Sequence, residues 1–220
     1  MFTGEGLGAS RDNFSTNLAR VKNIQQRLRR DHAARDEFLE QVMAREEEQA
    51  DCFGPVLWLA RDEREWRQSE HNTTLEMTFI YLVGMLDTFF GQWGQEHNLW
   101  GEDKWPTALP ERFAEVGLPL RSDVQPLLVE YRARRDVLIH RGGIANEKYC
   151  KAIGDMNLLN QRLPVDETYL DAAVEFIDYL VAATAVAKYS GPYRHESKTD
   201  WPQLIARMFV QKSTQASPAC

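Results

Sequence analysis

The residues best suited to chemistry lie in one short stretch, Arg135-Asp136-Val137-Leu138-Ile139-His140-Arg141-Gly142-Gly143. An arginine, an adjacent acid and a histidine five positions on are followed at once by two glycines. The planar guanidinium of arginine matches phosphate oxygens, and a histidine exchanges protons near neutral pH. Two glycines in a row are typical of a helix end. The stretch therefore predicts a cationic, titratable cluster on the last turns of a helix.

Helical geometry decides which of these side chains share a face. Asp136 and His140 are four residues apart and lie on one face, whereas Arg135 falls within the apolar stripe of the same helix. We expect Arg135 to point inward, and Asp87 on the preceding apolar stretch is its natural partner. The helix C-terminus and Asp136 both favour the positively charged form of His140. Such a group could protonate a leaving group or bind a phosphate.

Further cations surround the motif, with four arginines among residues 132–141. Guanidinium groups at this density indicate a local patch that could bind phosphate. The candidate substrate-binding residues are Arg132, Arg141, Lys148 and Tyr149. A simple helix terminus with favourable charges and an ion-paired arginine would explain the same residues without any function.

Composition limits the other functions that the chain could have. Lys+Arg 26 against Asp+Glu 33 gives a net charge of −7, so an RNA-binding interpretation depends on local charge alone. Cys52, Cys150 and Cys220 match no metal-ligand spacing, and no glycine-rich phosphate loop is present. We predict neither a metal site nor a cofactor.

The chain also lacks the patterns of secreted and membrane proteins. Residues 1–10 have no basic or apolar run of the kind found in signal peptides. The longest apolar stretch, residues 77–86, is too short and too polar at its edges to span a bilayer. Together with the unpaired cysteines, these features predict a cytoplasmic protein without a membrane anchor.

Apolar residues recur at helical spacing along most of the chain, and no alternating pattern of strand type is found. The fold class is therefore all-α, a helical bundle. In the first half we expect one long helix or two shorter ones over 12–50, a short helix through Trp58 and Trp66, and a very apolar helix that begins with a capping box at Thr73–Glu76. A connector over 97–119, with a short helix at 110–116, leads to the motif helix, which begins with a second capping box at Ser122–Gln125. An irregular segment over 144–164, a helix over about 170–184 and a short helix near 204–209 complete the chain. We divide the chain into a flexible N-terminus (1–11), N-terminal helices that pack on the bundle (12–70), the bundle domain (71–211) and a disordered tail (212–220).

The pattern Arg135-Asp136-x-x-x-His140, late on a helix and after a very apolar helix and a connector, resembles the Arg-[Asn/Asp/His]-x-x-x-His motif of HEPN domains. HEPN names the higher eukaryote and prokaryote nucleotide-binding families. The trailing Arg141-Gly142-Gly143 is similar to many members, in which glycine closes the helix. The resemblance covers roughly residues 70–190 and implies a bundle of HEPN type with an N-terminal helical extension.

In catalytic members the resemblance implies metal-independent RNA cleavage by attack of a ribose 2′-oxygen on the adjacent phosphodiester. His140 would then be the acid/base group, Arg135 would bind the phosphate, and Asp136 would orient the histidine or the helix. Two motifs usually meet across a homodimer, to which the apolar surface of residues 75–93 could contribute. Many members are toxins, several silenced by an antitoxin partner, or serve in phage defence. The alternative is a non-catalytic HEPN-like module that binds a nucleotide or a protein partner.

Overall fold

The structure is a computed structural model that describes residues 6–48, 54–97, 109–111, 113–114, 119–188 and 208. Its helices are α1 (Gly6–Glu48), α2 (Gly54–His97), α4 (Val124–Arg141), α5 (Glu147–Ile153), the 3₁₀ helix η1 (Met156–Leu158) and α6 (Glu167–Lys188). Within these ranges an isolated antiparallel bridge joins Ile144 and Arg162 and no strand is found, so the predicted all-α class is confirmed. No helix in these ranges is long and apolar enough to cross a membrane.

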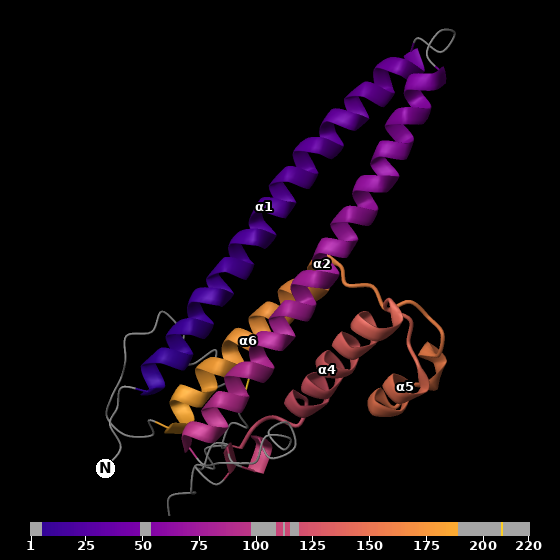
Figure 1. The fold of residues 1–220 in the computed structure, drawn as a ribbon. Helices are drawn as coiled ribbons and strands as arrows, with labels where there is room; N and C mark the ends of the chain where they lie inside the picture. The colour runs from indigo at the N-terminus through magenta and orange to yellow at the C-terminus, as the bar shows by residue number, and fades with distance from the viewer. Residues whose placement is uncertain are drawn as a thin grey trace, which may run out of the picture.

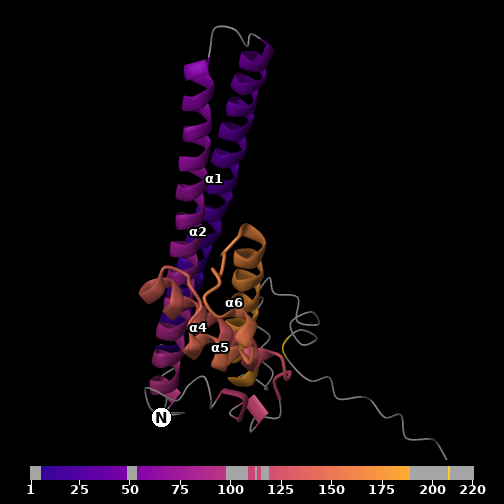
Figure 2. The same cartoon turned by 90° about the vertical axis from the view of Figure 1, so that its right-hand side faces the viewer.

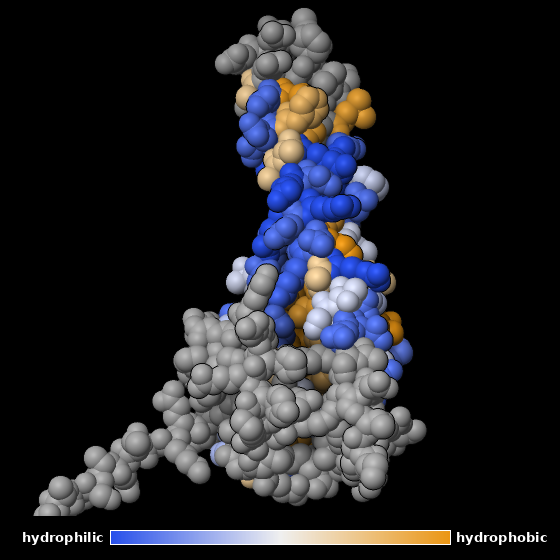
Figure 3. Space-filling model, turned by 90° about the vertical axis from the view of Figure 1, so that its left-hand side faces the viewer, coloured by the Kyte–Doolittle hydropathy of each residue, from blue (hydrophilic) through white to orange (hydrophobic). Residues whose placement is uncertain are grey.

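Helices α1 and α2 form a long antiparallel hairpin around which the other helices gather at one end (Figure 1). Helix α6 runs along the half of the hairpin that is farther from the α1–α2 connection. Helix α4 lies beside α2, and α5 is outermost (Figures 1 and 2). The far half of the hairpin projects beyond this group (Figure 1). The face of this half that Figure 3 shows is mostly hydrophilic, with apolar residues near the far end. The exposed apolar residues of this half include Phe38, Leu59 and Trp66.

The sequence allowed either one long helix or two shorter ones over residues 12–50. The structure has one long helix, α1, which begins at Gly6 rather than at residue 12. Its buried side chains recur every three or four residues, which is the spacing of one helical face. Phe14, Leu18 and Val21 lie on this face against the core, and Leu39 lies on it in the projecting half.

Helix α2 is continuous from Gly54 to His97, so the expected break before Thr73 is wrong. The Thr73 hydroxyl donates to the Ser69 carbonyl at 2.8 Å, and Thr74 bonds the Glu70 carbonyl in the same way. A threonine hydroxyl can cap a helix start or bond the carbonyl one turn back inside a helix. Here the second arrangement applies, because residues 69–74 lie inside the continuous helix α2.

Most of the apolar residues of α2 are buried in the core of the chain itself. Leu75, Phe79, Leu82, Leu86 and Phe90 are buried against α1, α4 and α6. The expected surplus of apolar surface on this helix is therefore not available to a partner, apart from single residues such as Met77 and Tyr81, which are half exposed.

Helix α4 begins at Val124, after Asp123, whose side chain makes no capping hydrogen bond. The capping box predicted at Ser122 is therefore wrong, because Ser122 lies outside the N-cap position. The apolar stripe of α4 is buried as expected at Val124, Leu128 and Leu138, whereas Leu127 is 37% exposed.

The segment expected to be irregular, residues 144–164, contains α5 and η1 and has a small core of its own. That core consists of Val137, Ala145, Tyr149, Cys150 and Leu163. In the connector over 97–119, residues 109–111 and 113–114 are helical as expected, and most of the remainder lies outside the described residues. Of the expected C-terminal helix only Met208 is described, as helical and buried, and the expected tail lies outside the description.

Candidate functional site

The predicted helix end is found at Gly142 and Gly143, which have φ values of +57° and +82°. The Gly142 amide donates to the Val137 carbonyl, and the Gly143 amide donates to the same oxygen at 3.3 Å, so the chain turns back on the last turn of α4. A side chain would strain both positions, since only glycine adopts positive φ without a Cβ clash. The turn therefore fixes where α4 stops, directly after His140 and Arg141.

Arg135 points inward and binds Asp87, as the helical spacing predicted. Its Nη1 forms an ion pair with Oδ2 of Asp87 on α2, and its Nη2 donates to Oδ1 of Asp136 at 3.0 Å. The Arg135 side chain is 19% exposed, so the guanidinium lies at the edge of the α2–α4 contact and still reaches solvent.

The charge of Arg135 is set by two opposing effects. Burial alone would lower the pKa of Arg135, but the hydrogen bond that Arg135 donates to Asp136 and the charge of Asp87 outweigh this effect, so the pKa is raised. The guanidinium therefore stays cationic at any pH at which the protein is folded. Its Nε is buried and has no hydrogen-bond partner among the described residues.

The other arginines of α4 divide into two groups. Arg132 is 38% exposed, with its Nε 3.1 Å from Oδ1 of Asp87, so Asp87 sits between two guanidiniums. Arg134 is 13% exposed and donates from Nε to Glu130 at 2.6 Å and from Nη1 to the Pro164 carbonyl at 2.8 Å. Arg132 can face a ligand, whereas Arg134 belongs to the interior.

Tyr149, a candidate substrate contact, is buried at 2% exposure. Its hydroxyl donates to Oε1 of Glu130 at 2.9 Å, and the Tyr169 hydroxyl donates to the other oxygen of that carboxylate. Arg134 lies over the Tyr169 ring, 4.2 Å from its centroid. Glu130 thus ties α5 and α6 to α4, and Tyr149 supports the site from beneath instead of facing a substrate.

Three of the candidate site residues remain at the surface. His140 and Arg141 are exposed, and within the described ranges their side chains form no hydrogen bond or ion pair. The Lys148 side chain is 86% exposed, with its Nζ 3.9 Å from Oδ2 of Asp136. Asp136 therefore faces Arg135 and Lys148, and no bond from it to His140 is found.

Sequence reasoning missed Arg162, which holds the glycine turn against the hairpin. Its Nη1 donates to the Gly142 carbonyl at 3.3 Å, and its Nη2 donates to Glu76 on α2 at 2.6 Å. Nearby, the Leu163 amide donates to the Gly143 carbonyl at 2.8 Å. Arg162 lies 86 residues from Glu76, so no local spacing could have indicated the contact.

The arrangement combines an exposed imidazole with three solvent-accessible cations, Arg132, Arg141 and Lys148, and with the ion-paired Arg135. Among the described residues no group of three or more histidine, cysteine or acidic side chains is placed to hold a metal ion. Imidazole and guanidinium groups together can bind a phosphodiester and transfer protons around it.

Comparisons with protein-family models, with curated proteins and with solved structures found no match to this chain.

Proposed function

We propose that this protein is a metal-independent endoribonuclease of HEPN type. The observation that carries the proposal is the position of His140, which is exposed and free at the glycine-closed end of a helix whose Arg135 is kept cationic by two carboxylates. Such an enzyme would act in the cell as a toxin or as a phage-defence effector.

The reaction would be an internal transfer of the phosphodiester. The ribose 2′-oxygen attacks the adjacent phosphorus, a bond from phosphorus to O2′ forms, and the bond to O5′ breaks. The products are a 2′,3′-cyclic phosphate and a 5′-hydroxyl end. His140 moves the proton, either from the 2′-hydroxyl or to the leaving 5′-oxygen. Arg135 and the exposed cations stabilise the additional negative charge on the phosphoryl oxygens.

In this assignment Asp136 acts on Arg135, because its Oδ1 accepts from Arg135 Nη2 at 3.0 Å. It holds the guanidinium plane, together with Asp87. The family resemblance implied that Asp136 orients the histidine or the helix. In this assignment the turn at Gly142 and Gly143 fixes the last residues of α4, including His140.

A homodimer would supply a second His140, so that one histidine serves as base and the other as acid. Exposed aliphatic side chains flank His140, with Ile139 at 50% and Ile144 at 39% exposure, and they support a contact between two copies at this end of α4.

A second candidate is a HEPN-like module that binds a nucleotide or a protein without chemistry. It is favoured by the ion pairs of Arg135, since a guanidinium held by Asp87 and Asp136 is already neutralised in part before any phosphate arrives. The two candidates differ in whether RNA is cut.

The test is cleavage of a mixed RNA pool in EDTA by the wild type, by His140→Ala and by Arg135→Lys. The first variant removes the proton-transfer group, and the second keeps the charge but loses the planar fork. We expect no cleavage by His140→Ala and a large loss in Arg135→Lys. The products should carry cyclic phosphates, and RNA with 2′-deoxy substitutions should resist.

Arg64→Ala is the matched control. Arg64 is a half-exposed arginine on the hairpin, with its guanidinium 3.6 Å from Glu40, and should not affect cleavage. Equal cleavage by the wild type and His140→Ala would exclude the nuclease assignment. Absence of cleavage by all proteins, with nucleotide binding that depends on Arg132 and Arg141, would support the binding module.

A further inference from the structure

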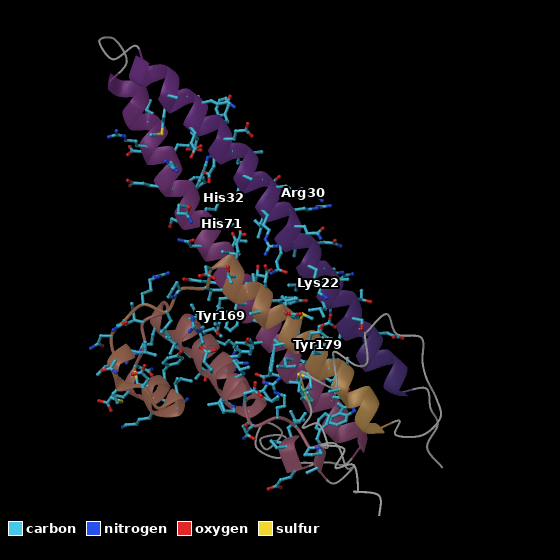
Figure 4. The ribbon with its side chains drawn as sticks, turned by 180° about the vertical axis from the view of Figure 1, so that it is seen from behind. Lys22, Arg30, His32, His71, Tyr169 and Tyr179 are labelled. Carbon is cyan, nitrogen blue, oxygen red and sulfur yellow. The ribbon has the colours of Figure 1, made fainter. Side chains whose placement is uncertain are left out.

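Two histidines meet ring to ring on the hairpin, away from the motif. His32 on α1 and His71 on α2 have ring centroids 4.1 Å apart and planes tilted by 43° (Figure 4). Both lie on the stripes of their helices that face the partner, where Leu39 and Leu75 supply apolar side chains. Two titratable rings thus take positions where aliphatic side chains would stabilise the hairpin at every pH.

Each ring has one carboxylate partner. Nε2 of His71 lies 3.2 Å from Oε1 of Glu167, the first residue of α6, and Nδ1 of His32 lies 3.1 Å from Oδ2 of Asp36. The His71 side chain is 8% exposed and that of His32 is 23% exposed. The pair therefore lies where α1, α2 and α6 meet.

The second nitrogen of His32 has no partner. Its Nε2 is buried and forms no hydrogen bond with any described residue. In the neutral ring, Nδ1–H donates to Asp36 and Nε2 carries only a lone pair. Protonation would put a charged N–H donor at this buried position with nothing to accept from it.

The surroundings can stabilise one added positive charge on the pair more readily than two. A small open cavity of about 110 Å³ adjoins both rings. The charged groups that face the pair are Asp31, Arg35 and Asp36 on α1, Arg67 and Glu70 on α2, and Glu167 and Asp171 on α6, both paired with Arg29. Arg29 already neutralises part of the charge of Glu167 and Asp171.

We propose that the His32–His71 pair is a proton-operated latch between the hairpin and α6. In the latched state at most one ring is charged. A second proton places two imidazolium rings in contact and forces α1 away from α2 and the start of α6, so acidification loosens the hairpin at this level.

The direction follows from the His71 environment. Burial lowers the pKa of His71 below its usual 6.5, the charge on His32 lowers it further, and Glu167 opposes both. The unlatched state therefore binds protons more tightly than the latched state. The contribution of neutral His71 is complete above about pH 6.5 and is lost as the pH falls below that value.

The test is NMR titration of the imidazole nitrogens in the full-length wild type, in His32→Gln and in Glu167→Gln. His32→Gln removes the neighbouring charge, so His71 should titrate at a higher pH. Glu167→Gln removes the favourable carboxylate, so His71 should titrate at a lower pH. Shifts in opposite directions distinguish a coupled pair from a general loss of packing. An unchanged His71 titration in His32→Gln would overturn the proposal.

Amide hydrogen exchange measures directly whether α1 separates from α2 near His32. Corrected for intrinsic rates, exchange over residues 28–36 should rise severalfold on going from about pH 7.5 to about pH 5. The rise should vanish in His32→Gln and persist in Ala33→Gln, the control at the exposed neighbouring position. A rise of equal size in His32→Gln would show that other groups open the hairpin.

Discussion

The carboxylate of Asp87 on α2 lies between the guanidiniums of Arg132 and Arg135 on α4, one on each of its oxygens. One acid thus fixes the position of the candidate phosphate-binding arginine and sets the register of the motif helix on the hairpin. Since Asp87 and Arg135 are each about one-fifth exposed, part of the cost of desolvating them is avoided.

Replacing Asp87 by Asn should destabilise the protein and weaken cleavage together. The change leaves two arginines without their shared anion, and we expect a loss of about 2 kcal/mol in unfolding free energy, below the ~3–5 kcal/mol of a fully buried pair. Urea unfolding gives the value. Asp178→Asn, which breaks the half-exposed pair with Lys22, is the control and should cost no more than about 1 kcal/mol. Equal losses in the two variants would contradict a special role for Asp87.

The tyrosines around Glu130 should make the protein sensitive to alkali. Burial raises the pKa of Tyr149 to about 12, and the charge of Glu130 adds to the effect. A raised pKa means that the folded state holds its proton longer than the unfolded state, whose usual value is 10. This contribution is complete below pH 10 and is lost as the pH rises towards 12, at about 1.4 kcal/mol per pH unit for each such tyrosine.

Glu130→Gln tests the cause of that sensitivity. Without the carboxylate charge, Tyr149 should ionise at a lower pH, which ultraviolet absorbance of tyrosinate would report. Tyr149→Phe identifies the contribution of Tyr149 to the absorbance curve. If the ionisation midpoint stays where it is in Glu130→Gln, burial alone accounts for the pKa.

The glycine turn offers a comparison within one chain. Gly142→Ala places a Cβ at φ +57°, and we expect a loss of about 1–2 kcal/mol, the cost of a left-handed residue. Gly84→Ala in the middle of α2 meets no atom within 4 Å and should gain about 0.5–1 kcal/mol. Thermal unfolding of both variants measures the two signs. A neutral Gly142→Ala would mean that the turn tolerates another conformation.

The parts of the site that the sequence could predict are those set by one helix. The inward direction of Arg135 follows from the helical repeat, and Asp87 stood out as an acid within an apolar stretch. The end of α4 could be predicted from Gly142 and Gly143, because two consecutive glycines after a helical pattern usually mark the end of the helix. HEPN membership stays a proposal.

The predictions that were wrong or missing concern side chains that can reach two or more partners equally well in the local sequence. Thr73 can cap a helix or bond a carbonyl one turn back, and only the surrounding packing decides. Asp136 can reach either His140, one turn further on, or the neighbouring Arg135. In the structure it accepts a hydrogen bond from Arg135. Glu130 meets Tyr149 and Tyr169 across 19 and 39 residues, which requires the path of α5 and α6 to be known.

The exposed cations should govern RNA binding more than the chemical step. Lys148 is 86% exposed, and Arg141 is exposed beside His140, so each can contact a phosphate without leaving a buried partner. Removing either by alanine should weaken binding and reduce the slope of log affinity against log salt by about one. Lys151→Ala is the matched control on α5, because Lys151 is 70% exposed and paired with Glu147 at 3.2 Å. Filter binding to RNA over a salt series, with His140→Ala as background so that no substrate is cut, separates affinity from cleavage. Salt slopes that are identical in all three variants would place the RNA elsewhere on the molecule.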